Sequence, residues 1–187
     1  MNVIITLTSI SGNKTLTVEP ASCIINRGIC NDSLQHRENS CDVNLVYEPE
    51  LYAFIVEQKQ INATLKNSAG ATLFTGVVSA DAGWTDEGNP FPLRQLPLTI
   101  KDYTSKLNVS TSEEIAYLDI LLSTALTKLS DDCGLSIVLD NVPTITLQAF
   151  VIPSGRNYLQ IFDMLCYQYG LTFYFDQLGR ICFLIFT

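Results

Sequence analysis

The first hundred residues alternate short apolar segments with turn-forming residues, and this pattern limits the fold more than any other feature of the chain. Turns that contain glycine separate two pairs of segments and predict two hairpins. These pairs are Met1–Ile10 with Thr15–Glu19 and Ile61–Lys66 with Ala71–Ser79. The other predicted strands are Ser22–Asn26, Val43–Tyr47, Leu51–Glu57 and Arg94–Ile100. Roughly seven strands at intervals of about 8–12 residues are typical of an antiparallel barrel or sandwich.

The apolar spacing changes after Ile100. Two overlapping capping boxes, Ser110/Glu113 and Thr111/Glu114, precede apolar residues at helical spacing from Ile115 to Leu129 and predict a helix there. A second helix is expected from Asn157 to Tyr169, with Gly170 at its end. The predicted strands of this half are Leu135–Leu139, Ile145–Val151 and a closing hairpin of Leu171–Phe175 and Arg180–Phe186.

The predicted fold class is therefore α+β. An antiparallel, barrel-like domain at residues 1–100 precedes a smaller α+β domain at residues 101–187, with two helices and a C-terminal hairpin. The chain ends on the apolar segment RICFLIFT, which predicts that the second domain continues in a longer protein.

Composition argues against two classes of partner. The chain has 11 basic and 19 acidic residues among 187, a net charge of −8, whereas nucleic-acid binding needs clustered Lys and Arg. Its longest uncharged apolar stretch, near residues 143–153, is far shorter than the ~18 residues that cross a bilayer. Charged residues make up only 16% of the chain and the mean hydropathy is +0.22, which favours apolar surface covered by another chain.

The residues able to carry chemistry do not form a recognisable catalytic or metal-binding motif. His36 is the only histidine, and the acids Asp81, Asp86 and Glu87 lack the order of a calcium-binding loop. Asp131-Asp132 is interpreted as the loop at a helix end. We therefore predict that the chain is not an enzyme and holds no metal or cofactor: no catalytic, cofactor-binding or metal-binding residue is assigned.

Cysteines and aromatic residues leave two alternatives open. The six cysteines are interpreted as buried free thiols, although Cys23 and Cys30 are close enough in sequence to form a small disulfide loop. Five aromatic residues near the C-terminus fit either a core or a sugar-stacking platform, and core is favoured. They are Tyr167, Tyr169, Phe173, Tyr174 and Phe175.

Three stretches, in this order, resemble the baseplate hub proteins of tailed bacteriophages and related contractile injection systems. The first joins Ser40–Leu45, which contains the Ser-Cys pair, to the L-F-x-G-x-V pattern of Leu73–Val78. The second is Leu98–Leu107, with its Asp-Tyr pair. The third is Ser154–Ile181, where Gly155, Gly170 and Gly179 occur in the spacing of the family. The departures are the cysteine content and the polar insertion 28–39.

The resemblance implies a structural role. Hubs of this family are trimers whose β-domains form a ring at the end of the tail tube and hold the spike or tail-tip components. The expected partners are further copies of the chain, tail-tube proteins and spike or tail-tip proteins. The expected location is the virion tail of a phage or prophage, assembled in the bacterial cytoplasm. The alternative hypothesis is a β-sandwich module for ligand binding, carbohydrate binding or adhesion that uses loop aromatic residues such as Trp84 and Tyr103.

Overall fold

The computed structural model describes residues 3–27, 38–58, 60–79 and 95–185. The chain divides into two compact units: the first unit contains residues 1–27 and 39–102, and the second unit contains residues 28–38 and 103–187. Each unit has an apolar core of its own. The predicted α+β class is confirmed, because most of the described chain is antiparallel sheet and four helices accompany it.

The first unit is built on one antiparallel sheet of seven described strands. They are β1 (Val3–Ser9), β2 (Thr15–Val18), β3 (Pro20–Asn26), β4 (Ser40–Val46), β5 (Ile61–Asn67), β6 (Thr72–Ser79) and β7 (Gln95–Lys101). Their order in the sheet is β2-β1-β5-β6-β7-β4-β3. Both hairpins expected from the sequence are present, β1 with β2 and β5 with β6.

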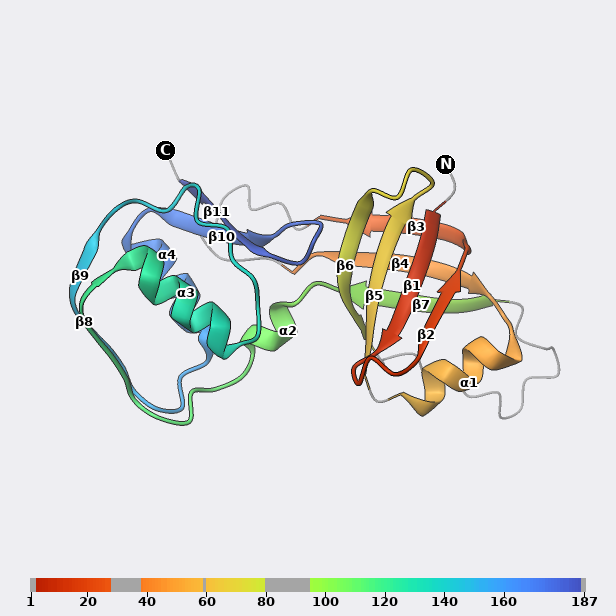
Figure 1. The fold of residues 1–187 in the computed structure, drawn as a ribbon, viewed down its shortest axis with the longest axis horizontal. Coiled ribbons are helices and arrows are strands. Elements are labelled where there is room, and N and C mark those ends of the chain that lie inside the picture. The colour runs from red at the N-terminus through yellow and green to blue at the C-terminus, as the bar shows by residue number, and fades with distance from the viewer. Residues whose placement is uncertain (1–2, 28–37, 59, 80–94, 186–187) are drawn as a thin grey trace. The chain divides into compact units, whose positions relative to one another are not determined.

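The sheet bends around its core, so that β1, β2, β5 and β6 cross in front of β3, β4 and β7 in Figure 1. β3, at one edge of the sheet, also contacts β1. Alternate residues on the strands face inward, as in β1, where Ile5 and Leu7 are fully buried. This curvature gives the unit its barrel-like form, with β2 and β3 as the edges of the described sheet.

The segment expected as a strand at Leu51–Glu57 is a helix, α1 (Pro49–Glu57). Pro49 occupies the first turn, where its missing N–H and fixed φ suit a helix start, and Glu50 adds an acid beside it. Leu51 and Phe54, three residues apart, are buried in the core of the first unit. The strand prediction was wrong because a short apolar segment fits both the two-residue period of a strand and the 3.6-residue period of a helix. The Pro49-Glu50 pair, which favours a helix start, decides between them.

The second unit contains three helices and two separate two-stranded sheets among its described residues. The elements are α2 (Thr104–Leu107), β8 (Ile115–Leu121), α3 (Leu122–Asp132), β9 (Thr146–Ile152), α4 (Tyr158–Gln168), β10 (Leu171–Phe175) and β11 (Ile181–Ile185). β8 pairs with β9 and β10 pairs with β11 (Figure 1). Helix α4 and the C-terminal hairpin agree with the sequence prediction, whereas α2 is a single turn that it missed.

The first predicted helix of this half begins later than expected, because Ile115–Leu121 is strand β8 and only Leu122–Asp132 is helical. The expected capping residue Thr111 instead bonds to the segment before α4: its backbone N–H donates to the Arg156 carbonyl at 2.8 Å, and its hydroxyl donates to the Pro153 carbonyl at 3.3 Å. Pairing of β8 with β9 therefore overrides the local helix signal.

The strand expected at Leu135–Leu139 is only an extended segment that meets β11. It forms one isolated parallel bridge, Ile137 with Ile181, supported by hydrogen bonds from Val138 N–H to the Ile181 carbonyl and from Ile181 N–H to the Ser136 carbonyl, both 2.8 Å.

Candidate functional site

An exposed apolar surface lies on the outer side of the β8–β9 ribbon. We define the β8–β9 apolar face as Ala116, Leu118, Ala149 and Val151, which form the cross-strand pairs Ala116 with Val151 and Leu118 with Ala149. Leu118 is 69% exposed and Val151 is 52% exposed. Contiguous apolar residues on a sheet face indicate a surface that another molecule covers.

The inner side of the same ribbon explains why these residues point outward. Tyr117 is buried, and its ring stacks on Phe150 with centroids 6.5 Å apart and an angle of 7° between the ring planes. Successive side chains of a strand point to opposite faces, so Tyr117 in the core leaves Leu118 at the surface. The register of β8 and β9 therefore creates the β8–β9 apolar face.

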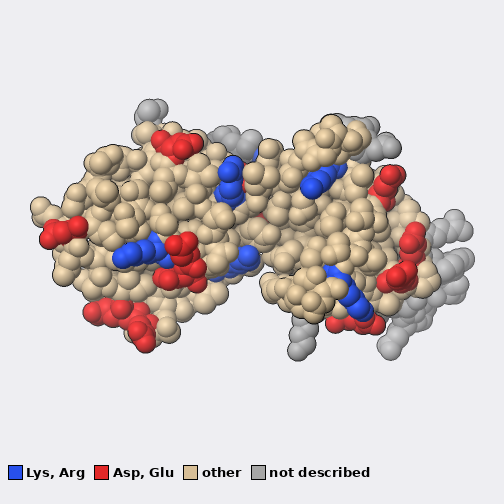
Figure 2. Space-filling model, viewed as in Figure 1, with Lys and Arg blue, Asp and Glu red and all other residues tan. Residues whose placement is uncertain are grey.

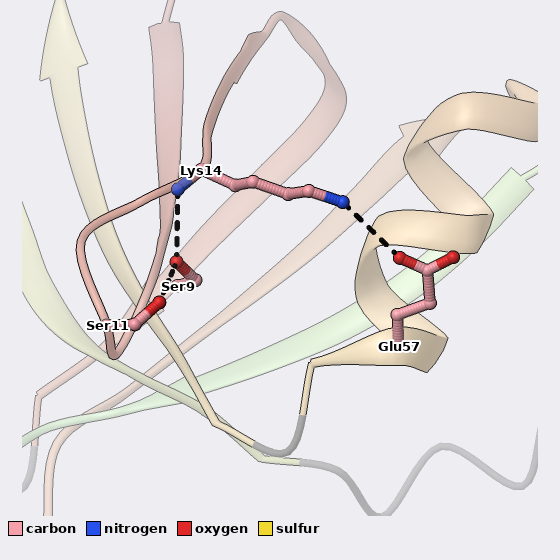
Figure 3. A network of polar contacts seen from close by, with 4 residues as sticks. All are labelled: Ser9, Ser11, Lys14 and Glu57. Carbon is pink, nitrogen blue, oxygen red and sulfur yellow. Dashed lines mark hydrogen bonds and ion pairs between the residues drawn. The ribbon is translucent and has the colours of Figure 1, made fainter.

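The first unit has a surface pocket of about 450 Å³ between the β1–β2 turn and α1. At its rim, Lys14 Nζ lies 3.5 Å from Glu57 Oε2, and both side chains are more than half exposed. Ser9 is buried below the turn, where its hydroxyl accepts a hydrogen bond from the Lys14 N–H at 3.2 Å and lies 3.1 Å from the Ser11 hydroxyl (Figure 3). These contacts tie the hairpin turn to α1. Because the Lys14–Glu57 pair is exposed, it stabilises the fold only slightly.

Two cysteines of the first unit lie in contact. Cys23 on β3 and Cys41 on β4 have their Sγ atoms 3.4 Å apart. Cys41 is fully buried, whereas Cys23 is partly exposed at the edge of the core. The alternative partner of Cys23 suggested by the sequence, Cys30, lies outside the described residues. The five described cysteines are free thiols, and Cys41, Cys166 and Cys182 among them are buried.

A polar cluster of the second unit holds two titratable groups with raised pKa values, Tyr117 and Cys133. The Tyr158 hydroxyl donates to Asp132 Oδ2 at 3.5 Å. Burial raises the pKa of Tyr117 to about 12, with smaller contributions from the charges of Asp132 and Tyr158. Burial and then the Asp132 charge raise the pKa of Cys133 to about 11. Both groups are protonated at neutral pH, so this cluster offers neither an activated thiolate nor a tyrosinate.

Several residues considered from the sequence cannot be placed. His36, Asp81, Trp84, Asp86 and Glu87 lie outside the described residues.

The acids Asp131 and Asp132, interpreted from the sequence as the loop at a helix end, instead form the last turn of α3. The Asp132 carboxylate there accepts the hydrogen bond from the Tyr158 hydroxyl. Within the described part of the chain, no group of three or more His, Cys, Asp or Glu side chains is arranged to hold a metal ion.

The C-terminal aromatic residues do not form one stacking surface. Phe173 and Phe175 are buried, Tyr174 is 38% exposed and Tyr167 is 70% exposed. Phe173 contacts Phe162 with ring centroids 5.5 Å apart, and Phe175 meets the ring of Tyr103 edge-on at 6.4 Å. The interpretation of these aromatics as core is correct for the two phenylalanines, and Tyr103 belongs to the same packing rather than to an open groove.

Charged side chains are sparse on the face drawn in Figure 2, where Lys and Arg occur in small separate groups beside Asp and Glu. No helix among the described residues combines the length and apolar character needed to cross a membrane.

The structure explains why three residues of the family-like stretches, Gly76, Asp102 and Gly170, are suited to their positions. Gly76 faces the interior where β6 passes close to β7, and a Cβ there would overlap the Lys101 carbonyl oxygen. Asp102 is buried, and its Oδ2 accepts hydrogen bonds from the Asn39 N–H at 2.7 Å and from Asn39 Nδ2 at 3.1 Å. Gly170 follows α4 with φ +65°, a left-handed conformation that favours glycine.

Comparison with known proteins gives matches among solved structures only. No family model matches the chain, and no curated protein matches it. The 43 kDa tail protein of prophage MuSo2 from Shewanella oneidensis superposes with a TM-score of 0.65 at 17% identity, over 99% of this chain and 56% of that one. The tail protein from Neisseria meningitidis MC58 has a TM-score of 0.65 at 15% identity, over 98% of this chain and 51% of that one.

A more distant match is the Francisella PdpA–VgrG complex, with a TM-score of 0.50 at 12% identity, over 97% of this chain and 28% of that chain. This chain thus spans about half the length of the two tail proteins. The fold is that of these tail proteins, and the likeness to phage tail and injection-system proteins indicated by the sequence motifs is confirmed at the level of the fold.

The sequence analysis missed the β8–β9 apolar face, the pocket beside α1 and the Cys23–Cys41 contact. The first depends on the register of β8 with β9, because the consecutive apolar residues Ala116, Tyr117 and Leu118 do not show by themselves which side chains are exposed. The other two depend on contacts between distant segments, which the local sequence does not specify.

Proposed function

We propose that the chain is a structural component of a phage or prophage tail whose copies form the baseplate hub, a ring that links the tail tube to the spike or tail tip. The observation that carries this proposal is the joint match of both units to the two tail proteins, over 98–99% of the chain. An isolated β-sandwich binding module would match in the first unit alone. We assign the two units to separate domains with a boundary near residues 100–102.

We propose that the ring contains three copies, in agreement with the family that the sequence motifs resemble. The β8–β9 apolar face supports self-association because Leu118 and Val151 are exposed apolar side chains that a neighbouring copy can cover. The edge strands β2 and β3 are further candidates for contacts between copies, since an edge strand presents backbone N–H and C=O groups with which a strand of a neighbouring copy can pair. The low charged fraction of 16% is in keeping with such covered surfaces.

The proposed partners are tail-tube proteins and spike or tail-tip proteins, and the proposed location is the virion tail after assembly in the host cytoplasm. The PdpA–VgrG match supports a partner of the spike type at the level of the fold. The net charge of −8 opposes affinity for DNA passing along a tail tube. The role requires no reaction, and we assign no catalytic residue.

Size-exclusion chromatography with light scattering tests the proposal on the full 187-residue chain. We expect a species of three times the 20.7 kDa chain mass at high concentration. Leu118→Glu places a charge in the β8–β9 apolar face and removes about 2 kcal/mol of apolar burial, so it should weaken association more than tenfold. Leu178→Glu is the matched control, because Leu178 is 48% exposed in the β10–β11 turn, away from that face.

One outcome would count against the hub, and another against the surface assigned to its contacts. A chain that stays monomeric at every concentration contradicts self-assembly. Equal weakening by both variants would mean that association, if present, does not use the β8–β9 apolar face.

A further inference from the structure

The Cys23–Cys41 pair is placed by the register of the β3–β4 ladder. Cys23 pairs with Val43 and Cys41 pairs with Ile25, so the two cysteines are diagonal neighbours on the same face of the sheet. Their Sγ atoms, 3.4 Å apart, are already in contact, although the residues are 18 positions apart in the chain. A disulfide bond of about 2.05 Å requires the sulfurs to approach by roughly 1.4 Å more.

The surroundings permit this approach. β3 is an edge of the described sheet, hydrogen-bonded to β4 alone, so a small shift of β3 breaks no ladder on its other side. Cys23 is also partly exposed, which gives a reagent access to one of the two thiols, while Cys41 is fully buried behind it.

We propose that Cys23 and Cys41 are a redox-sensitive thiol pair that oxidises to a cross-strand disulfide and fastens the edge strand β3 to β4. The proposed oxidant is a low-molecular-weight disulfide, for which oxidised glutathione is the probe.

The reaction proceeds in two exchanges. The Cys23 thiolate attacks the small disulfide, forms a mixed disulfide and releases one small thiol. The Cys41 thiol then loses its proton and attacks the Cys23 sulfur, which forms the Cys23–Cys41 bond and releases the second small thiol. Two protein thiols lose two electrons and two protons, and the small disulfide gains them as two thiols. Burial, followed by the Cys23 hydrogen bond and the charges of Cys23 and Asp42, raises the pKa of Cys41, so the Cys41 thiolate is scarce and the second exchange is the slower step.

The Cys23–Cys41 disulfide would change the stability of the first unit more than its shape. A cross-link over this separation restricts the unfolded chain and should raise the midpoint of thermal unfolding on the order of 10 °C. The pair would stay reduced in a bacterial cytoplasm and oxidise outside it. If the chain is part of a virion tail, oxidation would occur when the particle leaves the host cell, and this timing rests on the proposed function. The thiol chemistry itself does not depend on it.

Non-reducing peptide mapping of the intact chain tests the proposal. Trypsin separates the three relevant cysteines, because cleavage after Lys14, Arg27, Arg37 and Lys59 puts Cys23 in peptide 15–27, Cys30 in 28–37 and Cys41 in 38–59. The reduced chain is incubated with oxidised glutathione, remaining thiols are alkylated, and the digest is analysed by mass spectrometry. We expect peptides 15–27 and 38–59 joined, two hydrogens lighter than their sum, and the cross-link lost on reduction.

Variants make the result specific. Cys23→Ser, at the partly exposed position, should abolish the cross-link and the rise in thermal midpoint, as should Cys41→Ser if the buried hydroxyl is tolerated. Cys30→Ser and Cys166→Ser should keep both. Peptide 15–27 joined to 28–37, or no cross-link to 38–59 after prolonged oxidation, would overturn the proposal. Because every measurement is made on the chain alone, a failure of hub assembly leaves the result unaffected.

Discussion

Gly76 lies on β6, next to the end of the neighbouring strand β7. Its replacement by alanine tests how closely the two strands approach each other. An added Cβ would overlap the carbonyl oxygen of Lys101 and lie 2.8 Å from the carbonyl carbon of the same residue. Both are backbone atoms, so no side-chain rotation relieves the overlap. β7 must move away from β6, although Lys101 pairs there with Val77 and on its other side with Ser40 of β4.

The cost follows from these contacts. Displacing the Lys101 carbonyl weakens about two ladder hydrogen bonds at about 1 kcal/mol each, and overpacking a filled interior adds about 1–2 kcal/mol. We expect Gly76→Ala to lower the free energy of unfolding by about 3 kcal/mol. Gly70→Ala is the matched control in the same hairpin: its φ of +83° strains alanine, but its Cβ would meet open space, so about 1 kcal/mol is expected.

Urea denaturation followed by far-UV circular dichroism measures both variants, and hydrogen exchange locates the damage. Amides of Val77–Ser79, which face β7, should exchange faster in Gly76→Ala than in Gly70→Ala. If Gly76→Ala destabilises the chain no more than Gly70→Ala, the close approach of β6 and β7 is not the reason for glycine at this position.

Three further predictions concern single side chains. Gly170→Val should lower the free energy of unfolding by about 1 kcal/mol or more, because a β-branched residue resists φ +65°, and Gly170→Asn should cost less; equal melting temperatures for the wild type and the valine variant would contradict this. Asp102→Ala should cost about 2–3 kcal/mol in urea denaturation because it leaves two buried donors of Asn39 without this acceptor, and a loss below 1 kcal/mol would argue against the role. The folded state holds the Tyr117 proton more tightly, because its pKa is raised from the ordinary 10.0 to about 12, so its contribution to stability is retained below pH 10 and lost as the pH rises toward 12. Tyr117→Phe should therefore flatten the fall in stability over that interval by about 2 kcal/mol, and identical pH profiles would refute the assignment.

The hairpins were predictable because their turns are specified by the turn residues themselves. Asn67 Oδ1 accepts hydrogen bonds from the Ala69 and Ala71 N–H groups, at 3.0 and 2.9 Å, and Gly70 supplies a positive φ. Asp176 acts in the same way before Gly179, by accepting from the Leu178 and Arg180 N–H groups at 2.9 Å. Such Asx turns involve only neighbours in the chain, so a single sequence contains the necessary information.

The wrong predictions of secondary structure occur where a short apolar segment fits both the period of a strand and the period of a helix. Leu118, Leu121 and Leu122 fit a helical stripe, yet Leu118 is 69% exposed on β8 and only Leu122 begins α3. Pairing with β9, more than twenty residues later, decides between the two structures, and that information is not local. The β8–β9 apolar face and the Cys23–Cys41 contact were missed for the same reason, since each exists only through strand register.

The exposed apolar residues of the two units support one conclusion about assembly. In the first unit, Ile24 on the edge strand β3 is 62% exposed, and in the second unit Leu118 is 69% exposed on a ribbon. For a protein that works alone, an apolar residue on an open edge invites aggregation, and natural sheets usually place a charge or a proline there. For a ring subunit the same features are functional, because neighbouring copies cover them. The first unit also attaches β3 to β4 through side-chain bonds from Asn26 to Asp42 and from Asn44 to Ser22, in addition to the backbone ladder. An apolar edge that stays paired with its own sheet favours specific association over aggregation, and we therefore expect the isolated chain to associate to a defined size.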